Sequence, residues 1–411
     1  MSGGPYASAI PPGPIGPANQ RKSRGPLFAA VSAGVLVLVL AIAGIAFAVG
    51  GGNGKKKGGD PPAAAAACGY KIAYLGGLTG NNSADAQTVR NAAKLALDRH
   101  NRKHDGCTTE LAEFDTKGEA DEAARLAEQV VRDEKVLGVL GPLTYNEGQK
   151  VMPILEAAGL PVISPTLSHN AMSTRGWRTF HRTVGSDADQ ATAAAKYLTQ
   201  TLHARRVFVV AEVDEYGAGV ADDARLKLNT AFVGRAGIDG SATTYGTIVK
   251  DITNSLADAV YFAGYYDAGA ILVKELRAAK PDINIVTWDR LFTDLFAEAA
   301  GNTAAEGVVI TCPCVPPSEA RDNFANDYKA QYQEAGYYSP ESYDAANVLL
   351  AALAAGKATR ADILSFVNSY DGQGVSRRIK FTATGDLDPS SPTVWAYKIK
   401  SGGVYKEQVI A

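Results

Sequence analysis

Apolar runs alternate with amphipathic segments from Gly69 onward, and this alternation predicts an α/β fold. The clearest unit lies between Val136 and Ser168. Two Val/Leu/Ile-rich runs, VLGVLG and LPVIS, enclose a helix-length segment at about 147–158. Continuous apolar strands joined by a helix are typical of parallel β-α-β units whose sheet is covered on both faces. We therefore predict a parallel sheet in this part of the chain.

The same alternation fills the rest of the chain in two similar halves. In the first half, predicted strands at 70–75 and 109–114 precede helices at 84–102 and 119–134. The second half begins with a predicted helix at 187–202. Its predicted strands follow at 206–213, near 242–245, and at 259–265, 283–288 and 307–312, and a hairpin with its turn at 401–403 closes the chain. Repeated cycles of this kind indicate two doubly wound lobes with parallel sheets and a hinge. We expect 69–185 with 313–392 to form lobe one, and 186–312 with 393–411 to form lobe two.

The first 68 residues have a different composition. Residues 1–26 are rich in Gly and Pro and predict a disordered cytoplasmic tail. Residues 27–49 contain no charged side chain and are long enough to cross a bilayer as one helix. Residues 50–68 form a Gly/Lys/Pro/Ala linker. We predict a single-pass signal anchor in the cell membrane, with the folded part on the extracytoplasmic side. A cleaved leader remains open, because Ala46-Phe47-Ala48 resembles a cleavage site.

Composition and charge narrow the classes of partner. The chain has 411 residues, 46% of them hydrophobic, and a net charge of −2. This balance gives no reason to expect a nucleic acid partner.

Four cysteines allow three pairings. A bridge between Cys68 and Cys107 is plausible if the strands that follow them are neighbours, whereas Cys312 and Cys314 could close only a tight ring.

Motifs of catalysis and cofactor binding are missing from the sequence. We find neither a G-x-S-x-G nucleophile motif nor a G-x-x-x-x-G-K-[ST] phosphate loop. The glycines of Gly76-Gly77-Leu78-Thr79-Gly80 do not match the G-x-G-x-x-G spacing. None of the five histidines lies in a zinc-binding pattern. We therefore predict that the chain is not an enzyme and holds no cofactor or metal.

Polar and aromatic residues recur where the predicted strands end. They are Thr144-Tyr145 and Thr166 to Ser168 in the first half, and 214–217, 264–267 and Trp288-Asp289 in the second. Each group alone is explained by a turn or a helix cap. Small ligands bind at the carboxyl ends of strands in open α/β sheets. Recurrence at five strand ends from both halves therefore predicts a ligand cleft between the lobes.

Several motifs together resemble one family. They are KIAYLGGLTG, LGVLGPLTYNEGQ, LPVISPTLSHNAMSTRGW, DEYGAG and VYFAGYYDAGAIL. From about 69 to 403 the chain resembles the leucine/isoleucine/valine-binding family of type I periplasmic (ABC transporter substrate-binding) proteins. The resemblance implies the type I periplasmic-binding-protein fold. It also implies capture of a small amino acid, branched-chain or related, and delivery to the permease subunits of an ABC importer. The alternative is a membrane-tethered sensor of amino-acid or small-amide availability.

The resemblance also implies a set of binding residues. The ligand carboxylate would be held at Tyr145, Thr166 and Ser168. The ammonium would be held by Asp289 with help from Tyr265, and Tyr216 would close over the ligand. Two positions depart from the family, which often has a small hydroxyl residue in place of Tyr145 and Glu in place of Asp289. These departures could change which side chain fits, or admit a small amide.

Overall fold

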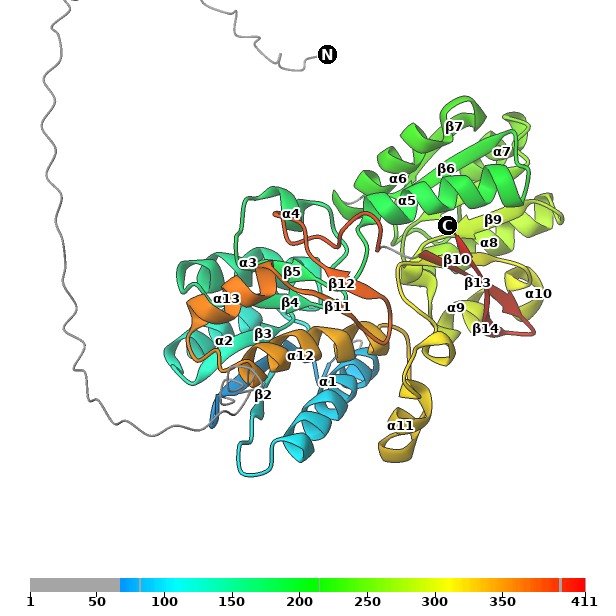
Figure 1. The fold of residues 1–411 in the computed structure, drawn as a ribbon. Coiled ribbons are helices and arrows are strands. Elements are labelled where there is room, and N and C mark those ends of the chain that lie inside the picture. Colours follow the sequence, from blue (N-terminus) through cyan, green and yellow to red (C-terminus); the bar gives the residue numbers. More distant parts are fainter. Residues whose placement is uncertain (1–66, 81–82, 214, 392–393, 411) are drawn as a thin grey trace, which may run out of the picture. The chain divides into compact units, whose positions relative to one another are not determined.

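Two sheets organise the part of the chain that the structure describes (Figure 1). The computed structural model describes residues 67–80, 83–213, 215–391 and 394–410. The alternation of strands and helices predicted from the sequence is confirmed, with parallel pairing throughout the first sheet and most of the second. Within the described ranges no helix has both the length and the apolar character needed to cross a membrane. The predicted tail, the anchor at 27–49 and nearly all of the linker lie outside those ranges.

The first sheet has the strand order β2-β1-β3-β4-β5. Its strands are β1 (Lys71–Gly76), β2 (Glu110–Asp115), β3 (Val136–Leu140), β4 (Val162–Ser164) and β5 (Phe180–Arg182). Every residue of β3 is buried, as its unbroken apolar sequence predicts for a central parallel strand. The carboxyl ends of these strands therefore meet along one edge, which is where the polar clusters of the sequence begin.

Helices from two distant parts of the chain cover this sheet. They are α1 (Ser83–Lys103), α2 (Ala120–Arg132), α3 (Tyr145–Ala157), α4 (Ala171–Thr174), α12 (Ser339–Ala354) and α13 (Arg360–Asn368). α12 packs against α1 and against β3, although some 200 residues separate β3 from it. The close approach depends on Gly138 in β3, where a Cβ atom would lie 2.8 Å from a methyl carbon of Leu349. This packing brings the start of α12 close to the loop that follows β1, at the carboxyl edge of the sheet.

The second sheet has the order β14-β13-β10-β9-β8-β6-β7. Its strands are β6 (Val207–Glu212), β7 (Phe232–Ile238), β8 (Ala259–Ala263), β9 (Asn284–Thr287), β10 (Val309–Cys312), β13 (Val394–Lys400) and β14 (Gly403–Ile410). Its helices are α5 (Asp187–Lys196), α6 (Glu215–Leu228), α7 (Gly246–Asn254), α8 (Tyr266–Ala279), α9 (Asp294–Ala300) and α10 (Asn302–Ala305). The structure also contains α11 (Phe324–Gln331) and the short hairpin β11 (Asp371–Gln373) with β12 (Arg378–Lys380). The predicted terminal hairpin is confirmed as β13 and β14.

One predicted strand was wrong. The strand expected near 242–245 is a loop before α7, and the edge strand is β7 at Phe232–Ile238. Gly234 and Gly237 interrupt the apolar run of β7, so its sequence carries no clear strand signal. Gly234 is needed there because a Cβ atom would lie 2.7 Å from the ring of Phe208 on β6.

All four cysteines are paired. Cys68 bonds to Cys107, which ties the residues before the neighbouring strands β1 and β2, and Cys312 bonds to Cys314 at the end of β10. The first bond joins positions 39 residues apart. A bond that closes a loop of this length restricts the unfolded chain and so stabilises the folded state.

We therefore expect that replacing Cys68 and Cys107 together by alanine lowers the free energy of unfolding by about 3–4 kcal/mol. Urea unfolding of the full-length protein, followed by circular dichroism, measures this change. Adding a thiol reductant that opens the bond should abolish most of the difference between wild type and variant. Equal stability under oxidising conditions would contradict the prediction.

Candidate functional site

A cavity of about 650 Å³ lies at the carboxyl ends of strands from both sheets. Loops after β1, β2, β3 and β4 form one wall, and loops after β8 and β9 form another. The first turn of α1 and the residues that begin α12 complete it. Its lining includes Asp85, Lys117, Thr144, Glu147, Thr166, Tyr265, Tyr266, Asp289, Arg290, Phe292, Tyr337 and Tyr338. The volume lies within the range of pockets for small molecules.

The structure brings three of the six predicted binding residues together. Thr166, Tyr265 and Asp289 line the cavity. Tyr145 and Ser168 do not line it, although they belong to the same loops. The backbone of Tyr216 begins α6, but its side chain lies outside the described part of the structure.

Asp289 is the most distinctive polar group of the cavity. Its side chain follows β9 directly and is buried, with 4% of the residue exposed. The neighbouring indole of Trp288 is fully buried and donates a hydrogen bond of 2.6 Å to the carbonyl of Gly264, which fixes this turn against the end of β8. The Tyr338 hydroxyl donates to Oδ2 of Asp289 over 2.6 Å. Oδ1 is buried and has no hydrogen-bond partner among the described residues.

An unpaired carboxylate oxygen in such a place is costly, because burial removes its hydration without replacing it. A cation brought by a ligand would supply the missing partner. Burial first, and then the nearby Asp289 carboxylate, raise the pKa of Tyr338 well above the usual value for tyrosine. The hydroxyl of Tyr338 therefore stays protonated and remains a donor. Among the described residues, Asp289 thus keeps one buried carboxylate oxygen as an unused hydrogen-bond acceptor.

A second tyrosine and aspartate stand beside the first pair. The Tyr337 hydroxyl donates to Oδ2 of Asp85, on the first turn of α1, over 2.9 Å. The Tyr337 ring stacks on Phe292 with ring centroids 4.8 Å apart and lies 5.1 Å from the Tyr338 ring. Asp85 is open to the cavity, yet the surrounding walls partly desolvate it and raise the pKa of its carboxyl above the usual value. Sequence reasoning missed this pair.

Two hydroxyls at the strand ends of the first sheet are already used within the protein. Thr166 Oγ1 donates to the carbonyl of Leu143 over 2.7 Å. Thr144 caps α3, and its hydroxyl and backbone N–H both donate to Oε2 of Glu147, over 2.8 and 3.0 Å. This capping box places a buried carboxylate behind the loop. The sequence predicted that this wall holds a ligand carboxylate. In the structure its hydroxyls bond mainly to groups of the neighbouring loops.

Tyr145 packs away from the cavity. Its ring stacks on His169 with centroids 3.7 Å apart, and its hydroxyl accepts a hydrogen bond of 3.1 Å from Arg175. Burial, followed by the nearby Arg182, lowers the pKa of His169 to about 4, so the imidazole is neutral at pH 7. The aromatic side chain thus holds the loop before α4 instead of facing the ligand space.

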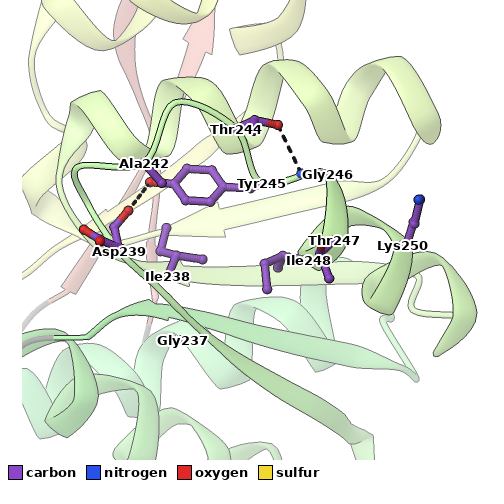
Figure 2. A pocket seen from close by; sticks show the side chains of 10 residues that line it. All are labelled: Gly237, Ile238, Asp239, Ala242, Thr244, Tyr245, Gly246, Thr247, Ile248 and Lys250. Carbon is purple, nitrogen blue, oxygen red and sulfur yellow. Dashed lines mark hydrogen bonds between the residues drawn. The ribbon is translucent and has the colours of Figure 1, made fainter. Parts of the chain in front are cut away.

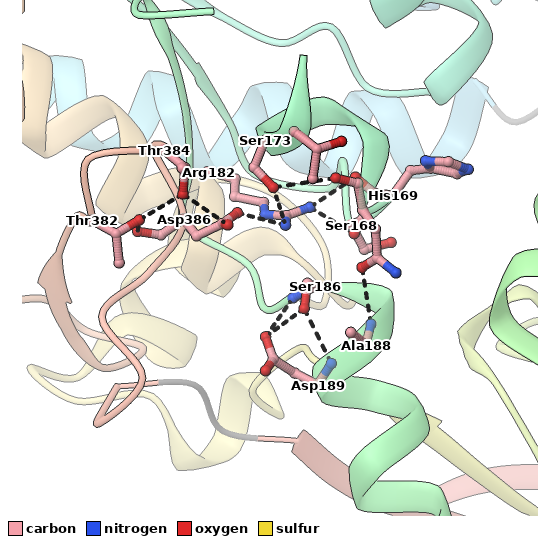
Figure 3. A network of polar contacts seen from close by, with 12 residues as sticks. Ser168, His169, Ser173, Arg182, Ser186, Ala188, Asp189, Thr382, Thr384 and Asp386 are labelled. Carbon is pink, nitrogen blue, oxygen red and sulfur yellow. Dashed lines mark hydrogen bonds and ion pairs between the residues drawn. The ribbon is translucent and has the colours of Figure 1, made fainter. Parts of the chain in front are cut away.

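Ser168 belongs to a network centred on Arg182 (Figure 3). The buried guanidinium of Arg182 donates to the carbonyls of Leu167, Ser168 and His169 over 3.2, 2.6 and 3.1 Å. It also forms an ion pair of 2.5 Å with Asp386. The Ser168 side chain is hydrogen-bonded to the buried carboxyl of Asp187, whose pKa burial raises to about 6. Arg182 therefore determines the path of the loop that carries both Thr166 and Ser168.

A second, smaller cavity of about 390 Å³ lies between β7 and α7 (Figure 2). Its lining includes Asp239, Thr244 and Tyr245, and the Tyr245 hydroxyl donates to the carbonyl of Asp239 over 2.7 Å. None of the six predicted binding residues lines it. Within the described ranges, no group of three or more His, Cys, Asp or Glu side chains could hold a metal ion.

Comparison with known proteins agrees with the fold. Residues 69–403 match the sequence profile of the family described as "Periplasmic binding protein". The chain belongs to this family. The resemblance noted from the motifs is thereby confirmed, and so is the type I periplasmic-binding-protein fold. The homologues and structural neighbours are solute-binding proteins and not enzymes, as predicted.

Individual relatives are distant in sequence but cover the folded part. The Leu/Ile/Val-binding protein BraC3 of Rhizobium johnstonii is 28% identical, over 81% of this chain and 92% of the relative. The leucine-binding protein LivK of Thermotoga maritima has 27% identity and a TM-score of 0.72, and covers 83% of this chain and 98% of its own. The isoleucine complex of LivJ from Streptococcus pneumoniae has 23% identity and a TM-score of 0.71, over 82% and 99% of the two chains. At that identity it shows the fold alone.

Arg182 provides a test of how the loop is held. Replacing Arg182 by methionine removes the guanidinium from three carbonyls and from Asp386. The carbonyls of Ser168 and His169 still keep one backbone donor each. We expect the free energy of unfolding to fall by about 3 kcal/mol. Arg178→Met is the matched control, because its side chain is 86% exposed and should matter by only about 0.5 kcal/mol. Urea unfolding measures both, and an equal effect of the two variants would contradict the assignment.

Proposed function

We propose that the chain is an extracytoplasmic solute-binding protein that captures a small amino acid, branched-chain or related, and delivers it to an ABC importer. The observation that carries this proposal is Asp289, a buried carboxylate at a strand end with one oxygen that receives no hydrogen bond from the described residues. Membership of the periplasmic binding protein family supports the same class of function. The names of the relatives, which refer to leucine, isoleucine and valine, support an amino acid as the ligand.

The proposed mechanism is closure of the two lobes around the ligand. The cavity takes its lining from loops of both sheets, so a ligand that contacts both walls favours the arrangement in which they are close. The ligand ammonium binds Oδ1 of Asp289, and Tyr338 holds the carboxylate in place through Oδ2. Tyr265 lies at the rim, where 41% of it is exposed, and it covers the ligand after entry.

Removing the charge of Asp289 tests this mechanism. Asp289→Asn keeps an acceptor for Tyr338 but removes the charge, so we expect amino-acid affinity to fall by ten- to a hundred-fold, about 1.5–3 kcal/mol. Calorimetric titration of the full-length protein with a panel of amino acids and small amides measures the loss. A ligand present at 100 times its dissociation constant also stabilises wild type by about 2.7 kcal/mol.

Asp267→Asn is the matched control, because Asp267 is an exposed carboxylate at the start of α8 and does not line the cavity. It should leave the affinity unchanged. Equal affinity of the Asp289 variant and wild type would show that Asp289 is not the ammonium site. A panel in which no amino acid or amide binds wild type would contradict the proposed function.

The proposed location is the outer face of the cell membrane, with residues 27–49 as an uncleaved anchor. The uncharged run of that segment supports it. Two disulfides in the folded part support an oxidising compartment. We expect the protein to remain in the membrane fraction after a carbonate wash and to keep residues 1–49 in its intact mass. A mass that begins after Ala48 would show that the segment is a cleaved leader.

A further inference from the structure

Two aspartates in the cavity are held by two consecutive tyrosines. Tyr337 donates to Asp85 over 2.9 Å, and Tyr338 donates to Asp289 over 2.6 Å. Asp85 comes from the first turn of α1, whereas Asp289 follows β9 in the other sheet. The cavity thus contains two separate carboxylates, one from α1 and one from the loop after β9, each oriented by a hydroxyl donor.

A bound amino acid with an apolar side chain would form an ion pair with only one of these two carboxylates. Its single ammonium pairs with the free Oδ1 of the deeply buried Asp289. Among the described residues, the Asp85 carboxylate is held by the Tyr337 hydroxyl and the charge of the nearby Arg290. A hydrocarbon side chain would take water away from it and offer no further donor, which costs free energy. A side chain that ends in a cation would instead form a charge-assisted hydrogen bond with Asp85. Asp85 therefore penalises branched-chain ligands and favours basic ones.

The rest of the lining favours a cation as well. Among the described residues, the acidic side chains of the lining are Asp85, Glu119, Glu147 and Asp289, against the basic Lys117 and Arg290. Five aromatic rings also line the space, namely Tyr265, Tyr266, Phe292, Tyr337 and Tyr338. Aromatic faces attract cations and pack well against the methylene stem of a long basic side chain.

We propose that the cavity selects an amino acid whose side chain ends in a cationic nitrogen, of the lysine, ornithine and arginine class. Asp289 binds the α-ammonium, Asp85 binds the side-chain nitrogen, and the methylene stem lies against the edge of the stacked Phe292 and Tyr337 rings. The proposal rests on the proposed amino-acid-binding function, and within it replaces the branched-chain ligand class by a basic one. It places the specificity of the protein at Asp85, outside the strand-end loops.

Lysine and norleucine give the sharpest test, because norleucine is lysine without its side-chain amine. Calorimetric titration of the full-length protein should show lysine or arginine binding at least about ten-fold more tightly than norleucine and leucine. Asp85→Asn should remove this preference, with lysine affinity falling about ten- to a hundred-fold and norleucine affinity unchanged. Asp98→Asn, on the same helix but outside the cavity lining, is the control and should behave as wild type.

The possible results separate this inference from the function on which it rests. If leucine or norleucine binds wild type as tightly as every basic amino acid, the inference is overturned while amino-acid binding stands. Retention of lysine affinity by Asp85→Asn likewise rules out Asp85 as the subsite. If no amino acid binds wild type, both proposals fall. Should Asp85→Asn not fold, the comparison of lysine with norleucine on wild type still decides the matter.

Discussion

The hydrogen bond from Tyr338 to Asp289 is the interaction on which the binding cavity depends. It joins the start of α12, which packs on the first sheet through α1 and β3, to the end of β9 in the second sheet. A buried carboxylate needs donors. Within the part of the chain that the structure describes, this one receives a hydrogen bond from Tyr338 on Oδ2 and none on Oδ1. Oδ1 of Asp289 therefore remains available as a strong hydrogen-bond acceptor. In the proposed function, the ligand is one that can donate to this oxygen.

The backbone at the start of α12 is unusual for the same reason. Tyr338 has a φ of 61°, in the left-handed region that bulky residues rarely adopt. Such a conformation costs on the order of 1 kcal/mol or more. The burial of the ring and the bond to Asp289 offset this cost. The turn lets two adjacent tyrosines reach carboxylates on different elements, which a regular helix start would not require.

The sequence predicted the order of strands and helices better than the contacts of the residues at the binding cavity. Hydrophobic periodicity is a local property, so the buried β3 and the loop at Asp289 could be read directly from it. Tyr145 and Ser168 stand at the expected strand ends, but Arg175 and Asp187 bind their side chains, and no local pattern reveals those partners. Asp85, Tyr337 and Tyr338 lie at helix starts instead of strand ends. The packing of α12 on α1 brings them to the cavity, and that packing spans about 250 residues of sequence.

Oδ1 of Asp289 also affects how the proposed closure of the two cavity walls depends on the ligand. In the proposed mechanism, water reaches Oδ1 and hydrates it when the two walls of the cavity move apart. When they come together without a cation, that hydration is lost and the charge is left with the single hydroxyl of Tyr338, which is unfavourable. A ligand with an ammonium group removes this penalty only in the closed arrangement, and a ligand shifts a conformational equilibrium only by such a difference in affinity. An uncharged solute of the same size would gain the aromatic contacts but would leave the penalty in place. In the proposed function, closure thus depends on the charge of the ligand, because one carboxylate is incompletely paired without it. Recognition by an importer then depends on the same charge.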